Sequence, residues 1–169
     1  MDYRELNAIR QVAEVMKTLF GEMLQLISAG ALGLFVGALL AEGFLFVPYW
    51  RSLPADVFFS LHKEYGPRIY RFFAPLTILA TMLAIVAAVV CFATAQPGHW
   101  PTAIAGILSV SMMGIYLIYF KQANAKFAEG RIRADELAAE LGRWARWHWV
   151  RVIIGVIAFA AALFGLRGF

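Results

Sequence analysis

Ionisable side chains stand inside or at the edge of long apolar runs. Glu42 lies within the apolar segment 39–47, and His148 and Arg151 open the last apolar run. A carboxylate inside a membrane is costly unless it is neutralised or paired, so an ionisable residue there is a functional candidate. Two interpretations remain open. Glu42 takes part in proton transfer, or it forms a salt bridge with Arg151 or Arg71 that holds two helices together.

His148 shares one helix face with Trp144, four residues before it, and Arg151, three residues after it. The same face continues through small residues, which mark the packing side of a membrane helix, so His148 and Arg151 are expected to point inward. Histidine acts as a general base or as a metal ligand. The alternative is an interfacial histidine that only forms hydrogen bonds, beside tryptophans that anchor the membrane interface.

Two more polar residues are expected at the same membrane face. Asn124 follows the third apolar run on one face with Tyr116, and His62 follows the first run. Asn124 either binds a ligand or caps its helix, and His62 is either a ligand of a metal or a solvated loop residue. His148, His62 and Glu42 form a possible set for iron, copper or zinc, with haem as a related cofactor.

The elements that must position these residues are membrane helices. The chain has 169 residues, 62% of them hydrophobic and 15% charged, against about 25% charged in an ordinary soluble domain. Its apolar residues come in blocks, and a block of roughly 20 can cross a bilayer as a helix. This predicts an all-α integral membrane protein with an antiparallel four-transmembrane-helix bundle over 23–169. The expected spans are 23–47, 70–95, 102–121 and 147–166.

The connecting segments have their own patterns. Residues 1–22 predict an amphipathic helix that lies on the membrane or continues into the first span. Pro48 is expected to end the first span. A short interfacial helix over 53–65, stopped by Gly66-Pro67, is expected in the first loop, and helix over 133–146 in the last connection.

The positive charges predict an orientation. Four spans put both termini on one side, which carries Arg4, Arg10, Lys17 and Arg167, while the remaining eleven of the fifteen Lys and Arg residues lie on the loop side. This excess favours a cytoplasmic loop side and extracytoplasmic termini, in a bacterial inner membrane. The net charge of +4 is explained by topology, and no nucleic-acid motif is present.

The first span carries a stripe of small residues four apart, which lets another helix approach closely. It predicts a contact between copies of the chain in a homo-oligomer. The other expected partners are the lipid bilayer and a lipophilic small molecule. The stripe consists of Ala29, Gly33, Gly37 and Ala41.

Several of these segments together resemble the anthrone oxygenase-like family of small four-helix membrane proteins, over about residues 24–168. The resemblance implies an oxidoreductase, since some members oxygenate polycyclic anthrones during aromatic polyketide synthesis. Only Asn124, Trp144, His148 and Arg151 are carried over from the family's pattern. The segments that carry the resemblance are a Gly-rich first span running into Phe46-Val47-Pro48, Pro75-Leu76, Ala123-Asn124 and Trp144…His148…Arg151.

The resulting hypothesis is an oxygenase for a lipophilic aromatic or quinone-like substrate that enters from the bilayer. His148 would act as a base or metal ligand, Arg151 would stabilise the anion, and Asn124 would orient the substrate. Glu42 would tune His148 or share its proton. The alternatives are a non-catalytic haem- or metal-binding membrane protein and an accessory or structural subunit. The expected substrate contacts are Trp144, Trp147, Tyr116 and Phe44.

Overall fold

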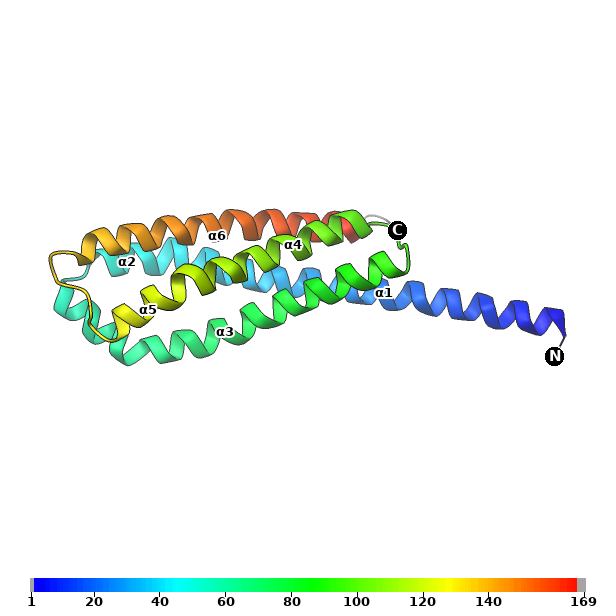
Figure 1. The fold of residues 1–169 in the computed structure, drawn as a ribbon, viewed down its shortest axis with the longest axis horizontal. Helices are drawn as coiled ribbons and strands as arrows, with labels where there is room; N and C mark the ends of the chain where they lie inside the picture. The colour runs from blue at the N-terminus through cyan, green and yellow to red at the C-terminus, as the bar shows by residue number, and fades with distance from the viewer. Residues whose placement is uncertain (1, 167–169) are drawn as a thin grey trace.

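The computed structural model describes residues 2–166, which fold into helices and contain no strand in that range (Figure 1). Four helical stretches are long and apolar enough to cross a membrane, which confirms the predicted four-helix architecture. The elements are α1 (Tyr3–Ala41), η1 (Glu42–Phe46), α2 (Val47–Ser52), α3 (Ala55–Ala93), α4 (His99–Ile115), η2 (Tyr116–Phe120), α5 (Lys121–Ala128) and α6 (Leu137–Leu166).

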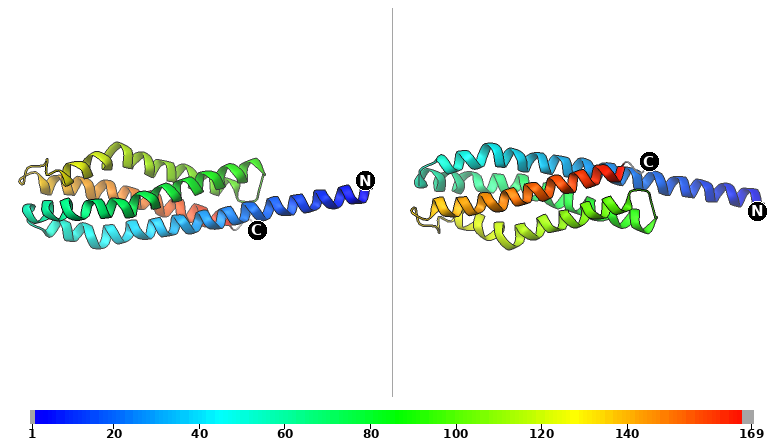
Figure 2. Two further views of the ribbon diagram at one scale, coloured as in Figure 1. Left: turned by 90° about the horizontal axis from the view of Figure 1, so that it is seen from below. Right: turned by 90° about the horizontal axis from the view of Figure 1, so that it is seen from above.

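The four stretches form an antiparallel bundle in which α1 and α4 each pack against both α3 and α6 (Figure 2). Large side chains of α1 fill the centre, where they meet small residues of the other helices, because small residues let membrane helices approach closely. The central cluster includes Leu32, Phe35, Leu39, Ala80, Ala84, Ala105, Met112 and Ala158.

The N-terminal segment continues directly into the first span. α1 runs without a break from Tyr3 and leaves the bundle as a single straight helix (Figure 1). Residues 2–20 are all exposed. The end of α6 lies on the same side of the bundle, as four antiparallel spans require. Arg167, part of the predicted terminal charge, lies outside the described residues.

The predicted break at Gly66-Pro67 was wrong. The expected short helix 53–65 and the second span form the single helix α3, with Pro67 and Pro75 inside it. A proline leaves the carbonyl four residues before it without its helical hydrogen bond. These carbonyls belong to Lys63 and Arg71, both exposed residues, so the prolines interrupt the ladder on the outer side of the helix.

Two further boundaries differ from expectation. Pro48 does not end the first helix, which continues to Ser52 in α2. The helix before Pro48 widens into the π-segment η1, where the Val47 N–H bonds to Glu42 O, five residues back. The last connection becomes helical only from Leu137, not from 133.

A second π-segment, η2, interrupts the third helix. Its Lys121 N–H bonds to Tyr116 O, again five residues back. π-Helical turns are rare and frequently lie at functional sites. Here each one begins with a polar residue, Glu42 in η1 and Tyr116 in η2.

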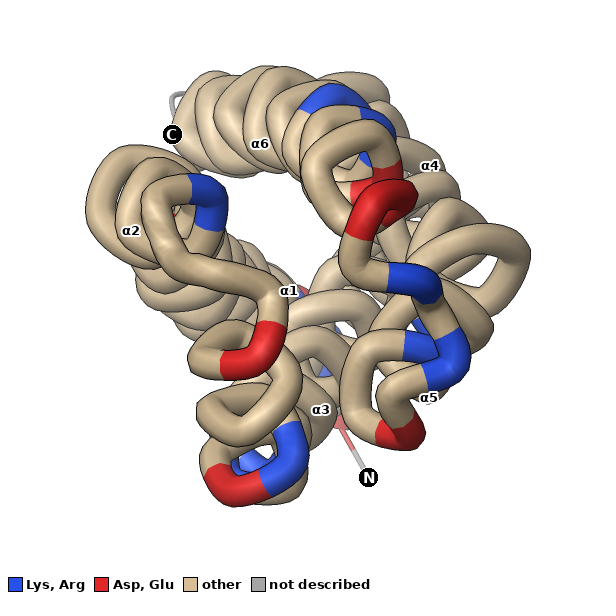
Figure 3. Tube along the Cα trace, turned by 90° about the vertical axis from the view of Figure 1, so that its left-hand side faces the viewer, with Lys and Arg blue, Asp and Glu red and all other residues tan. Residues whose placement is uncertain are grey.

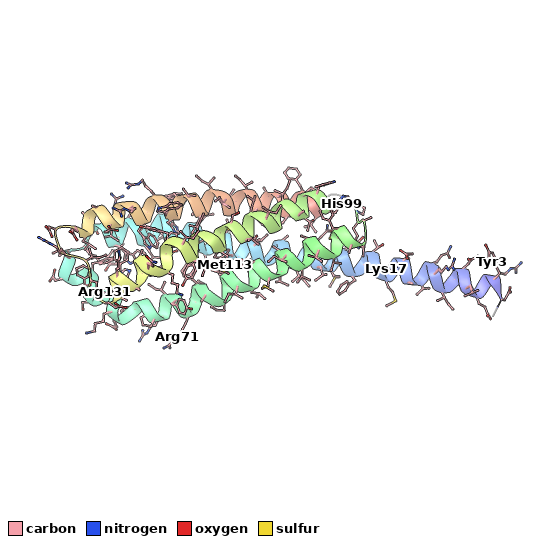
Figure 4. All side chains as sticks on the ribbon, in the orientation of Figure 1. Tyr3, Lys17, Arg71, His99, Met113 and Arg131 are labelled. Atoms are coloured by element: carbon pink, nitrogen blue, oxygen red, sulfur yellow. The ribbon has the colours of Figure 1, made fainter. Side chains whose placement is uncertain are left out.

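We call the end of the bundle with the 53–54 and 129–136 connections the loop-side end, and the opposite end, with the 94–98 connection, the terminus-side end. Arg131 lies at the first and His99 at the second, with Met113 between them (Figure 4). Lys and Arg gather with Asp and Glu at the loop-side end (Figure 3). Which end faces the cytoplasm stays a prediction.

Candidate functional site

A cavity of about 600 Å³ lies in the loop-side half of the bundle. Every helical stretch contributes to its wall, including both π-segments, which supply Glu42 and Tyr116. The remaining wall is largely aromatic and aliphatic, with Phe73, Ile78 and Met113 among its residues. Concave, mostly apolar pockets with a few polar groups are the usual form of small-molecule sites.

The cavity wall reaches the outer surface of the bundle at α3 and at the η2–α5 part of the third helix. Tyr70 and Ile78 on α3 and Leu117 on η2 line it, yet each is more than half exposed. These exposed residues belong to helical stretches that are apolar enough to span the membrane. This part of the cavity wall therefore faces the surface on which lipid would lie.

Three ionisable side chains from two helices meet at the inner wall. Glu42 and Arg151 line the cavity and are each 5% exposed, whereas His148 is 0% exposed and lies behind the wall. The distance from His148 Nδ1 to Glu42 Oε2 is 3.5 Å. The sequence predicted that these residues lie at one membrane face, because the ends of antiparallel spans meet there. The structure places His148 and Glu42 next to each other.

Within residues 2–166, Arg151 has a cation–π contact and no ion pair. Its guanidinium carbon lies 4.6 Å from the centre of the Phe120 ring, a cation–π contact. Its Nε has no hydrogen-bond partner among residues 2–166. Arg151 interacts electrostatically with Glu42 and Tyr116. The cation thus faces the cavity with unused donors.

The salt bridge considered for Glu42 is absent from the described residues. No Arg151 nitrogen lies within ion-pair distance of Glu42, whose ionic contact within residues 2–166 is with His148. Arg71 is exposed and points away from the bundle (Figure 4). Docking of two helices by an arginine–glutamate pair does not explain why Glu42 is buried.

The side chain of Asn124 accepts a hydrogen bond from another helix, in addition to the two roles considered for it, ligand binding and capping of its own helix. The Trp144 Nε1–H donates to Asn124 Oδ1 at 2.9 Å, and both residues line the cavity. Because the carbonyl oxygen of the amide is used, its NH₂ group remains for a ligand. Tyr116, which was predicted to contact the substrate, also lines the cavity.

The two histidines proposed as metal ligands are separated by tryptophan rings. The His62 ring lies 5.0 Å from Trp50, Trp50 lies 5.7 Å from Trp144, and Trp144 lies 5.1 Å from His148, centre to centre. No group of three His, Cys, Asp or Glu residues within 2–166 is arranged to hold a metal ion. His148, His62 and Glu42 therefore do not converge on one metal ion.

Two of the expected substrate contacts lie on the outside of the bundle. Phe44 is 65% exposed and packs edge-on against Trp149. Trp147 is 41% exposed and stacks on Tyr119. Neither lines the cavity, so the structure does not bring them together with Trp144 and Tyr116.

Sequence reasoning missed several residues of the cavity. Trp50 on α2 and Tyr70 on α3 line it, as does Lys121 at the start of α5. Trp50 was visible as an aromatic residue just after the first apolar run, and Lys121 lies one turn before Asn124 on the same helix face. No sequence pattern indicated that Tyr70 lines the cavity, because its place in the wall depends on which helices are neighbours.

The half of the small-residue stripe nearer the terminus-side end packs inside the bundle. A Cβ on Gly33 would lie 3.0 Å from Phe159 of α6, whereas nothing lies within 4 Å of a Cβ on Gly37. Ala29 is buried and Ala41 is exposed. Gly37 and Ala41 are the exposed members of the stripe, and a contact with a second copy of the chain stays a prediction.

Residues 67–161 match the sequence model of the family described as anthrone oxygenase. This region is more than half of the chain and includes Asn124, Trp144, His148 and Arg151, whereas Glu42 lies before it. No curated protein and no solved structure matches the chain. The family match agrees with the expected resemblance, and the chain belongs to the anthrone oxygenase family.

Proposed function

We propose that the protein is a membrane oxidoreductase that oxygenates a lipophilic aromatic or quinone-like substrate inside the cavity. The observation that carries this proposal is that Glu42 and Arg151 both lie on the wall of a largely apolar cavity without forming an ion pair with each other. A group that takes up a proton and a cation that stabilises the resulting anion are together what proton removal from a weakly acidic carbon or hydroxyl group needs. Membership of the anthrone oxygenase family supports the reaction class.

The chemistry starts from a CH₂ group that lies between two aromatic rings joined by a ketone, as in anthrone, or from a phenol. Removal of one proton leaves an electron pair that is delocalised onto the substrate oxygen. For the CH₂ group, this anion transfers electrons to dioxygen, a C–O bond forms, and water leaves, so CH₂ and O₂ become C=O and H₂O. Arg151 would stabilise the oxyanion, and Asn124 would orient the substrate through its free NH₂ group.

The exposed part of the cavity wall supports entry from the bilayer. A lipophilic aromatic compound concentrates in the membrane, and Tyr70, Ile78 and Leu117 offer it an apolar mouth between α3 and η2. Within the cavity, the rings of Trp50 and Trp144 provide flat surfaces for stacking. The polar end of the substrate would then meet Glu42 and Arg151.

Turnover of anthrone by the full chain in lipid nanodiscs tests the proposal. We expect one O₂ consumed per quinone formed, measured by an oxygen electrode and by product absorbance against protein-free nanodiscs. Arg151→Met should lower kcat by about 10²–10³-fold, because a donor to the developing oxyanion is lost.

The matched control is Arg143→Met, on the same helix. Arg143 is exposed, pairs with Glu140 at 3.3 Å and does not line the cavity, so its removal should leave kcat unchanged. Equal rates for the Arg151→Met variant and the unaltered chain would contradict the proposed role of the cavity.

A further inference from the structure

Building on the proposed function, we propose that Glu42 is the group that exchanges a proton with the substrate, and that His148 is a positioning residue that acts through Glu42. The sequence alone favoured His148 as the base. The structure separates the two residues, because Glu42 lines the cavity and His148 does not. A side chain that is 0% exposed behind the wall cannot touch a ligand in the cavity.

The backbone of α1 fixes which ring nitrogen of His148 carries hydrogen. His148 Nε2 lies 2.9 Å from the carbonyl oxygen of Leu39. A carbonyl oxygen only accepts, so Nε2 carries the hydrogen and donates it. The other nitrogen, Nδ1, is thereby turned towards Glu42 Oε2 at 3.5 Å. This is the arrangement in which a buried partner sets the tautomer and orientation of a histidine.

Packing prevents the imidazole from swinging into the cavity. The rings of Trp144 and His148 are nearly parallel, at an angle of 7° with centres 5.1 Å apart. At the edge of the imidazole ring, a Cβ on Gly43 would lie only 3.2 Å from His148 Nε2. Gly43 is the second residue of η1, so the π-segment brings a residue without a side chain to the place where the histidine approaches the helix.

The distance between Nδ1 and Oε2 leaves Glu42 available for a ligand. At 3.5 Å the two groups interact electrostatically without a closed hydrogen bond, and Nδ1 has no hydrogen-bond partner within residues 2–166. Glu42 therefore accepts the proton when the substrate C–H or O–H bond breaks, and the electron pair stays on the substrate facing Arg151. His148 Nδ1 then shares the proton held by Glu42.

Infrared spectroscopy tests the coupling without requiring turnover. The carboxyl stretching band of Glu42 is assigned by its loss in Glu42→Gln. We expect His148→Gln, which keeps an amide donor for the Leu39 carbonyl, to shift that band. The matched control His99→Gln, at the terminus-side end, should leave it unchanged. A Glu42 band that does not respond to His148→Gln overturns the positioning role.

Kinetics with anthrone distinguish the two roles. Glu42→Gln should lower kcat by about 10²–10⁴-fold, the usual contribution of a general base. His148→Gln should lower it only about 10–100-fold, as substitutions of supporting residues do. Because His148 acts through Glu42, the double variant should be no slower than Glu42→Gln alone.

The remaining outcomes are also decisive. A His148→Gln variant slower than Glu42→Gln overturns the assignment and makes His148 the base. If the unaltered chain does not turn anthrone over, addition of anthrone must still change the Glu42 band for the proton-exchange role to stand. A band that responds to His148→Gln but not to anthrone shows that the pair is coupled and that Glu42 does not meet this ligand, which overturns the proposal. Failure of turnover alone counts only against the proposed function.

Discussion

The bundle has a buried polar cluster at each end, and the two are built differently. At the terminus-side end, Gln25 Nε2 donates to Thr102 Oγ1 at 3.0 Å, and Gln96 Nε2 donates to Lys17 O at 2.9 Å. At the loop-side end, Glu42, His148 and Arg151 carry ionisable groups, and both His148 Nδ1 and Arg151 Nε lack hydrogen-bond partners among the described residues.

The two clusters also differ in how tightly they are packed. The terminus-side cluster is tightly enclosed, since a Cβ on Gly21 would collide with the Gln96 side chain. The loop-side cluster borders the cavity. At the terminus-side end, amide donors of neutral side chains tie α1 to α4 and to the α3–α4 connection, and only the acceptors Gln25 Oε1 and Gln96 Oε1 are without partners among the described residues. At the loop-side end, Glu42 and Arg151 face an open volume, and Arg151 Nε is an unused donor within that range. The first arrangement stabilises the fold, and the second is suited to binding and chemistry.

The largest expected effect comes from removing the charges of the loop-side cluster. Glu42→Leu combined with Arg151→Met should raise the free energy of unfolding by about 1–4 kcal/mol, as replacement of buried charges by apolar side chains often does. Turnover should be lost. Unfolding in mixed micelles, followed by tryptophan fluorescence, measures the first quantity. A less stable double variant would show that the loop-side charges serve helix docking.

A smaller effect of opposite sign is expected at the terminus-side cluster. Gln25→Leu removes the hydrogen bond to Thr102 and should lower the free energy of unfolding by roughly 0.6–1.7 kcal/mol, the range for hydrogen bonds between membrane helices. Turnover should be retained, because Gln25 does not line the cavity. Unfolding in mixed micelles measures the stability of Gln25→Leu, and the oxygen electrode measures its turnover. If turnover is lost while the free energy of unfolding is unchanged, the terminus-side cluster serves the reaction and does not only stabilise the fold.

The smallest effect sharpens the boundary of the loop-side site. Phe44→Leu and Trp147→Leu change exposed side chains that do not line the cavity. Their KM for anthrone should stay within about twofold of the unaltered chain, since isolated surface substitutions rarely matter by more than a few tenths of a kcal/mol. Trp144→Leu serves as the positive control and should raise KM. An equal rise in KM for Trp147→Leu would show that the substrate binds at the outer surface of the bundle.

Much of the fold was predictable because long apolar runs have few solutions in a bilayer. Four spans require antiparallel helices, and that alone brings Glu42, Asn124 and His148 to one end of the bundle. The breaks were less predictable. Proline stops a helix only if the missing hydrogen bond cannot be tolerated, and at Pro67 and Pro75 the affected carbonyls lie on the outer side of α3.

The details of the site depend on features that local patterns do not contain. Phe44 lies inside η1, where the regular helical period from Glu42 no longer applies, so its direction could not be inferred from spacing. The depth of His148 depends on the Leu39 carbonyl and on Gly43, both more than a hundred residues away in the chain. Helix periodicity predicted an inward direction for His148, but not whether the side chain would reach the cavity or stop behind its wall.

The π-segment η1 also determines how α1 is aligned with the rest of the bundle. Each residue of an α-helix turns the chain by about 100°. One extra residue in a regular helix would therefore rotate Tyr3–Ala41 by about that angle relative to Val47–Ser52. The wide turn of η1 takes up one residue instead, because its backbone bonds five residues back. Deleting one residue within 42–46 would leave an α-helical turn with Leu32, Phe35 and Leu39 still in the core, and the change would fall on Glu42 and Gly43.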